Sequence, residues 1–261
     1  MAGGHLHFGG IDAYAKMHSP IHDWDTRFKI VGLLSLIVAF ALVQDWRLLP
    51  ALVLITVAIY IASGLPWHVL RHRLTIPGAF IGMLVLFMPF IAGETVIAQF
   101  GPLDVRREGL ELAGLVAVRF FCIVSLAFVM LDTDTFYRTI EALRALRFPD
   151  LMADMVLLTY RYLFVVGDFF GRMQTAARLR GFQGTLFSIA TLNTFASLIG
   201  HMLIRSYDQS ERVYKAMVLR GYGNSAIRPQ LFKSNQTDRL KLAAAIIVAV
   251  ALTLAQYIYF A

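Results

Sequence analysis

Apolar residues gather into long continuous blocks along this chain, and a more polar region with helical spacing separates the last block from the others. A helix needs about 20 mainly apolar residues to cross a membrane. Five blocks come near that length, and they are residues 28–44, 48–64, 78–99, 112–131 and 242–260. The pattern predicts an all-α integral membrane protein with about five transmembrane helices.

The region between the fourth and fifth blocks, residues 132–241, has the helical period but many charges. A short amphipathic helix is expected to begin near Thr135, with "DTD" at 132–134 as a candidate N-cap. A second long helix is expected over 150–180 and a third over about 186–220. The apolar halves of these two helices fit a sixth and a seventh span, or helices that lie beneath the others.

Composition and charge agree with a membrane protein. The chain is 58% hydrophobic, whereas a soluble domain is nearer half apolar. Its single cysteine, Cys122, excludes a disulfide within the chain. The net charge is +7, and the chain shows no nucleic-acid-binding motif. In a membrane protein this balance points to basic cytoplasmic segments.

The distribution of basic residues predicts an orientation in the bacterial inner membrane. Fifteen Lys and Arg residues lie in 132–241, whereas the predicted outer loops hold Arg47, Arg106 and Arg107. The positive-inside rule then places the N-terminus in the cytoplasm and the C-terminus outside. The expected organisation is a cytoplasmic segment 1–27, a four-helix membrane domain 28–131, a cytoplasmic helical region 132–241 and a final transmembrane helix 242–261.

A repeat with an offset of forty residues links the ends of the two long expected helices. "RLRGF" at 178–182 corresponds to "VLRGY" at 218–222, and seven of the twenty positions from 163 to 182 recur identically. On each helix the shared residues form one stripe, because they recur every four positions. The two stripes are Asp168, Arg172, Ala176 and Arg180, and Asp208, Arg212, Ala216 and Arg220. The aspartate and the first arginine of each stripe can pair along the helix.

The repeat has two interpretations. Any helix end favours a basic residue in its last turn and a glycine directly after it, as Gly181 and Gly221 are placed here. Capping alone does not explain why an aspartate recurs twelve residues before each arginine, or why an alanine recurs between them. The repeat therefore also fits a docking device, in which Arg180 and Arg220 each present a guanidinium group to carboxylates of a partner.

These motifs resemble the transmembrane T component of energy-coupling factor (ECF) transporters, and most of all its cobalt/nickel branch, the CbiQ family. That family carries two Ala-Arg-Gly signatures at the ends of cytoplasmic coupling helices, where this chain has "AARLRGF" and "AMVLRGYG". Leu179 and Leu219 stand in place of the signature alanine. The N-terminal entry into the first span is also similar, with Asp25, Arg27 and Lys29 in an Asp-x-Arg-x-Lys element.

The resemblance implies a non-catalytic permease subunit of an ATP-driven importer for a divalent transition metal, cobalt or nickel. Two copies of a P-loop ATPase subunit (CbiO-like) would hold ATP and Mg²⁺, and this chain would bind no cofactor itself. It would transmit their closure to a substrate-binding membrane subunit (CbiM-like), with a small accessory subunit (CbiN-like) as a further partner. The implied docking residues are Ala176, Ala177, Arg180, Gly181, Ala216, Arg220 and Gly221, supported by Asp168, Arg172, Asp208 and Arg212.

An integral-membrane lipid or prenyl transferase is the alternative, with Mg²⁺ held by Asp132 and Asp134. A two-metal enzyme would usually show a second acidic cluster, and the sequence shows none. A self-contained channel is disfavoured because the spans offer few polar residues to line a path.

Several other polar residues are candidates for contacts. Glu94 and Arg119 are charges within predicted spans, and they pair with each other, contact a substrate-binding subunit or reach the membrane surface. His68 and His72 have a spacing compatible with a metal site, but two arginines flank them, so we expect headgroup or partner contacts. The histidines of "HLH" at 5–7 are expected to lie in an exposed N-terminal segment.

Overall fold

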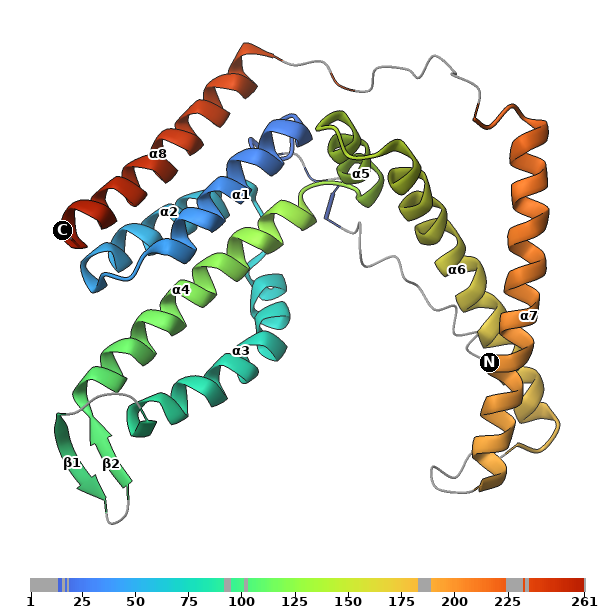
Figure 1. Ribbon diagram of the computed structural model, residues 1–261, viewed down its shortest axis with the longest axis horizontal. Helices are drawn as coiled ribbons and strands as arrows, with labels where there is room; N and C mark the ends of the chain where they lie inside the picture. The colour runs from blue at the N-terminus through green and yellow to red at the C-terminus, as the bar shows by residue number, and fades with distance from the viewer. Residues whose placement is uncertain are drawn as a thin grey trace. The chain divides into compact units, whose positions relative to one another are not determined.

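The computed structural model describes residues 14–15, 17, 19–91, 95–100, 103–182, 189–223, 232 and 235–260 (Figure 1). The chain divides into two compact units. We call one the membrane unit, formed by Ile11–Phe148 and Phe232–Ala261. We call the other the helix-pair unit, whose described helices lie within Pro149–Leu231.

The membrane unit is built from helices with one small hairpin. Its helices are α1 (Thr26–Leu42), a short 3₁₀ helix η1 (Trp46–Leu48), α2 (Leu49–Ser63), α3 (Trp67–Ile91), α4 (Arg107–Asp132), α5 (Phe136–Ala145) and α8 (Gln236–Phe260). The strands β1 (Val96–Phe100) and β2 (Leu103–Arg106) pair antiparallel between α3 and α4 (Figure 1). The all-α architecture predicted from the sequence is confirmed, and the hairpin is a local addition to it.

Helices α1 and α4 form the centre of the membrane unit, because α1 packs against α4, α5 and α8, and α4 also packs against α2 and α3. Leu33, Leu36 and Phe40 on α1 are at most 3% exposed, and they meet Leu126 of α4 in one apolar cluster. Gly32 lets α8 approach, since an added Cβ would lie 3.0 Å from the Trp24 ring and 3.3 Å from Ala245. Close packing of this kind holds helices together in lipid, where apolar burial alone gives little drive.

Four described helices are long and apolar enough to cross a membrane, and these spans are Trp46–Ser63, Trp67–Phe90, Arg107–Asp132 and Gln236–Ile258. Helix α1 is the fifth apolar helix of the unit, but it has 17 residues. At about 1.5 Å per residue it extends roughly 26 Å, slightly less than a hydrocarbon core of about 30 Å. Neither α6 (Asp150–Leu179) nor α7 (Ile189–Leu219) is among the spans found in the described residues.

The third span lies earlier than the sequence predicts. The prediction was 78–99, but α3 begins at Trp67, and Val96 to Gln99 belong to β1. The basic stretch before Pro77 lies outside the predicted spans 48–64 and 78–99. Helix α3 nevertheless includes Arg73, whose charge is matched by Asp132 of α4, so this part of the helix carries a compensated charge.

The helix-pair unit consists of α6 and α7, which contact each other. The Tyr222 hydroxyl, just beyond the end of α7, donates to Asp154 near the start of α6 at 3.2 Å, so the two helices run antiparallel. Arg205 of α7 lies over the Phe169 ring of α6, 4.0 Å from its centroid. Ala153 is the only buried residue among the described residues of α6, so this helix leaves most of its side chains accessible.

Candidate functional site

The end of α6 is a Schellman motif, which is a specific C-terminal cap closed by a left-handed residue. Gly181 has φ +87°. Its N–H donates to the Arg178 carbonyl at 3.0 Å, and the Phe182 N–H donates to the Ala177 carbonyl at 3.1 Å. These bonds satisfy carbonyl groups that a helix end otherwise leaves unpaired. Arg180 is thereby fixed at the cap position.

The end of α7 repeats this geometry. Gly221 has φ +83°, and its N–H donates to Val218 at 2.9 Å, while the Tyr222 N–H donates to Met217 at 3.0 Å. An added Cβ at Gly181 or Gly221 would meet nothing within 4 Å. The backbone conformation and not the surrounding space therefore requires glycine at both positions. The glycine caps expected at both helix ends are confirmed.

The caps present exposed side chains at both helix ends. Arg180 and Arg220 are exposed, and Leu179 and Leu219 before them are 84% and 88% exposed. Across the described residues, neither arginine has an ion-pair partner. Each cap therefore offers a guanidinium next to a large apolar side chain on a rigid turn. The docking role of these ends stays a prediction.

The predicted stripes lie on the surface, but their internal ion pairs do not form. All eight stripe residues from Asp168 to Arg220 are exposed. Arg212 donates to Gln209 at 3.0 Å instead of pairing with Asp208, and the neighbouring i,i+4 pair on α7 joins Glu211 to Lys215 at 2.8 Å. Within the described part of the helix-pair unit, no ion pair joins Asp168 to Arg172. The two stripes are therefore free to contact other molecules.

A groove of about 640 Å³ runs between α6 and α7. Its walls are mainly apolar, with Met155 and Tyr162 on α6 facing Val213 and Met217 on α7. Arg172 also lines this groove, which places one stripe residue at its edge. A groove between amphipathic helices can accept an apolar side of a partner helix.

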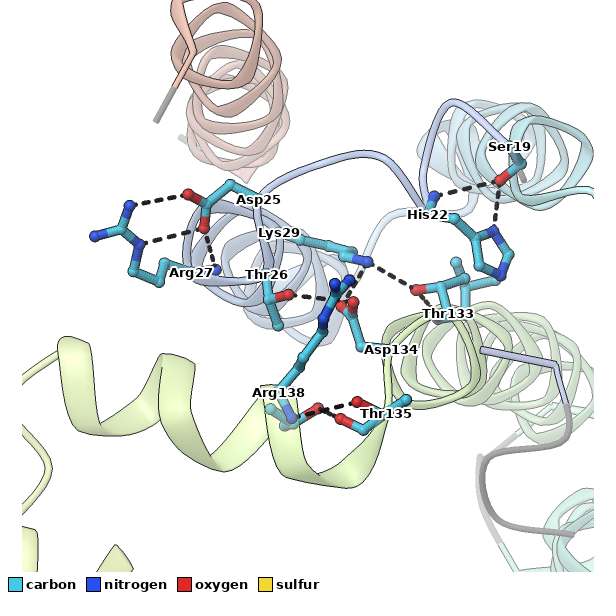
Figure 2. A network of polar contacts seen from close by, with 12 residues as sticks. Ser19, His22, Asp25, Thr26, Arg27, Lys29, Thr133, Asp134, Thr135 and Arg138 are labelled. Carbon is cyan, nitrogen blue, oxygen red and sulfur yellow. Dashed lines mark hydrogen bonds and ion pairs between the residues drawn. The ribbon is translucent and has the colours of Figure 1, made fainter. Parts of the chain in front are cut away.

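The predicted Asp-x-Arg-x-Lys element forms the start of α1 (Figure 2). Asp25 is the N-cap, and its side chain accepts from the Arg27 backbone N–H at 3.0 Å. The Arg27 guanidinium returns to the same carboxylate at 2.9 Å. Arg27 also lies 5.0 Å from the Phe232 ring, ahead of α8. The element thus ties the start of α1 to the segment before the last helix.

Lys29 makes a buried ion pair that the sequence did not reveal. Its ammonium lies 2.5 Å from Asp134, and the two side chains are 0% and 3% exposed. Lys29 also donates to the Thr133 hydroxyl at 3.2 Å, and the Thr26 hydroxyl donates to Asp134 at 3.1 Å (Figure 2). Burial raises the pKa of Asp134, although the nearby Lys29 acts in the opposite direction. This network fastens the turn between α4 and α5 to α1.

Both aspartates of "DTD" are matched by basic groups. Asp134 pairs with Lys29, and Asp132 pairs with Arg73 of α3 at 2.6 Å. Thr135 is the N-cap of α5, where its side chain accepts from the Arg138 N–H. No group of three metal-ligating side chains occurs among the described residues. The two carboxylates are therefore structural in this arrangement, and the transferase alternative is not favoured.

Arg119 donates to the carbonyls of Ala41 and Val43, at 3.2 and 3.1 Å, so it compensates the C-terminal end of α1. Glu94 and residues 5–7 lie outside the described residues, so the predicted pair of Glu94 with Arg119 stays a prediction. His68 and His72 are exposed in the first turns of α3.

Comparison with known proteins gives one consistent family. The pattern of the CbiQ family, described as cobalt transport protein, matches residues 17–231. The chain is 27% identical to the nickel permease LarQ of Lactiplantibacillus plantarum, across 85% of this chain and 75% of that protein. It is 24% identical to the energy-coupling factor transporter transmembrane protein EcfT of Staphylococcus aureus, across 95% of this chain and 97% of that protein.

Two further relatives are matched over a smaller part of their length. A fused cobalt transport protein CbiMQ of Methanocorpusculum labreanum is 29% identical across 81% of this chain and 36% of that protein. An uncharacterized protein of Methanocaldococcus jannaschii is 29% identical across 46% of this chain, and this match spans 44% of that protein.

Proposed function

The chain belongs to the CbiQ family of transporter membrane components, which are not enzymes, and from this we propose that it is the coupling subunit of an ATP-driven importer. In this proposal the importer is of the energy-coupling factor type and carries a divalent transition metal, with cobalt as the first candidate and nickel as the second. The metal is the cargo and is bound by a separate membrane subunit. The relative CbiMQ, whose name describes a fused cobalt transport protein, supports a partner of that type.

One observation carries the proposal. Two helix ends forty residues apart share the same Schellman geometry, and each presents an exposed arginine, Arg180 or Arg220. We infer that each arginine docks into a carboxylate-lined groove on one of two ATPase subunits, which hold ATP and Mg²⁺. A guanidinium suits this role because its planar fork makes two parallel bonds to one carboxylate. The exposed leucine beside each arginine adds apolar contact area to the same patch.

The chain itself offers a route for transmitting motion. Helix α6 follows α5 in the chain after four residues, and α5 packs against α1 in the membrane unit. The Lys29–Asp134 pair fixes the segment before α5 to α1. We infer that a displacement of α6, driven by ATPase closure, reaches the membrane helices through this fixed segment. A bistable complex needs firm contacts of this kind at both ends of the moving element.

The proposal includes an orientation. With α1 to α4 and α8 crossing in turn, the N-terminus lies in the cytoplasm and the C-terminus outside. The concentration of Lys and Arg in 132–241 supports this arrangement, because positive residues favour the cytoplasmic side.

Co-purification from the native membrane tests the docking role. The tagged chain should recover a P-loop ATPase together with a second membrane protein. Arg180→Ala or Arg220→Ala should weaken recovery of the ATPase, and the double variant should abolish it while leaving the membrane protein bound. Arg178→Ala and Lys215→Ala are matched controls, because both are exposed basic residues on the same helices that lie before the caps. Wild-type ATPase recovery by the double variant would refute the docking role.

A further inference from the structure

A second groove, of about 670 Å³, lies in the membrane unit between α2, α3 and α4. On α2 its wall is formed by Val53, Val57 and Ile61, which recur every four residues and are 42%, 48% and 73% exposed. All three helices are long and apolar enough to cross the membrane. This face of the unit therefore meets the hydrocarbon of the bilayer.

The hydroxyl groups inside this groove are already hydrogen-bonded. The Thr56 hydroxyl donates to the Leu52 carbonyl at 2.8 Å, and the Ser125 hydroxyl donates to the Phe121 carbonyl at 2.7 Å. Both groups are thereby satisfied within their own helices, as polar groups in lipid must be. The groove is suited to an apolar chain and not to a polar solute.

One end of the groove carries aromatic side chains, and exposed basic side chains lie on the same turns of α3. Trp67, at the start of α3, lines the groove, is 69% exposed, and packs edge-on against Tyr60 with ring centroids 6.0 Å apart. Arg71 lies one turn further along α3 and is exposed, as are His68 and His72. Tryptophan and tyrosine concentrate at the level of lipid headgroups. This end of α3 therefore lies at a membrane surface.

Arg71 differs from its neighbour Arg73 in having no acidic partner. Arg73 pairs with Asp132 at 2.6 Å, whereas no ion pair is formed by Arg71 in the described chain. Arg71 lies on α3 between Leu70 and Leu74, which both line the groove, so its free charge belongs to the same end of this helix. A ligand that satisfies both features has a negative head and a long apolar chain.

We propose that this groove binds an anionic phospholipid. One acyl chain lies along Val53, Val57 and Ile61, and the headgroup phosphate lies against Arg71 beside Trp67. The exposed histidines of the same turns face the headgroup layer. The unpaired arginine one turn beyond Trp67 favours a lipid over a transmembrane helix of a partner subunit, because a helix would fill the groove without requiring a positive charge near this end. This binding does not depend on ATPase docking.

Lipid binding to the purified full-length chain tests the proposal. The chain is mixed in mild detergent with equal amounts of phosphatidylglycerol and phosphatidylcholine of identical acyl chains, and the bound lipids are counted by native mass spectrometry. We expect phosphatidylglycerol to be preferred, and Arg71→Gln to lower its binding about fivefold, the effect of one basic residue near an anionic lipid surface. Binding of phosphatidylcholine should not change. Arg107→Gln is the control, because Arg107 is an exposed arginine at the start of α4, outside the groove, and is paired with Glu111.

Two further measurements separate lipid from protein in the groove. Val57→Trp fills the groove from an exposed position, so it should lower the binding of both lipids without disturbing the fold. A photoreactive residue at position 61 should label phospholipid in native membranes. Equal phosphatidylglycerol binding by Arg71→Gln and the wild-type chain would overturn the proposal. So would a crosslink at position 61 to a membrane protein with no labelled lipid, which would assign the groove to a partner helix.

Discussion

The buried Lys29–Asp134 pair makes a strong prediction for Lys29→Met. This variant keeps an unbranched side chain of similar length but leaves Asp134, which is 3% exposed, without its counter-charge. At 2.5 Å the gross attraction between two unit charges is about 7 kcal/mol at an effective dielectric constant of 20. Part of this is offset by the desolvation of both groups. Removing one partner of a buried pair typically destabilises a protein by about 3–5 kcal/mol.

The expected result is therefore a loss of about 3–5 kcal/mol in the free energy of unfolding at neutral pH. Equilibrium unfolding in mixed micelles, followed by tryptophan fluorescence, measures it. Lys215→Met is the control, because it makes the same substitution in a pair whose side chains are 68% and 54% exposed. Exposed pairs are worth about 0–1 kcal/mol. A loss below about 1 kcal/mol for Lys29→Met would show that the pair does not hold the turn to α1.

A double variant and the pH dependence of stability give two further tests of this pair. Replacing both residues by apolar ones, as in Lys29→Met with Asp134→Leu, should restore much of the loss, because no unpaired charge remains. Burial raises the pKa of Asp134, and removing Lys29 takes away a group that lowers it. A carboxyl whose pKa is raised in the folded state binds its proton more tightly there, so folding gains stability as the pH falls. The defect of Lys29→Met should thus shrink as the pH falls through the raised pKa of Asp134.

Two other predictions concern the helix ends and the membrane core. Gly181→Ala and Gly221→Ala should each destabilise their helix end by about 1–2 kcal/mol because the native φ is left-handed. Gly171→Ala, inside α6 with nothing within 4 Å of the added Cβ, should instead stabilise this helix by about 0.5–1 kcal/mol. Amide hydrogen exchange along α6 and at the end of α7 measures these changes. Arg119→Met should lower the free energy of unfolding by about 1–2 kcal/mol because two carbonyls at the end of α1 lose their donor. Arg119→Gln should lose less, and an equal loss would show that the guanidinium is held by something other than these bonds.

The helix ends show what the sequence could predict. Glycine after a basic last turn has a local meaning, so the capping geometry at Gly181 and Gly221 followed from a few adjacent residues. The apolar blocks likewise predicted the membrane helices and the membrane class. These features depend on residues close together in the chain, where pattern and structure are directly linked.

The buried network shows why the rest could not be predicted. The Asp-x-Arg-x-Lys element and "DTD" were both noticed, but nothing local joins Lys29 to Asp134, which are 105 positions apart. The start of α3 was predicted too late in the chain for a related reason. A charged residue such as Arg73 is not expected inside a span unless its partner Asp132 on α4 is known. The ion pair expected between Asp208 and Arg212 does not form, because Arg212 donates instead to the nearby Gln209. Spacing allowed the pair with Asp208 but did not select it.

The buried lysine also has a consequence for the synthesis of the protein in the cell. Lys29 enters the membrane with α1, yet Asp134 is translated 105 residues later. At about 5–20 residues per second, the first helix waits roughly 5–20 s before its counter-charge leaves the ribosome. The lysine stands in the first turn of α1, where its long side chain can reach the membrane surface while it is unpaired. The assembly of the membrane unit therefore has an order, in which α1 inserts alone and is locked in place after α4 has arrived.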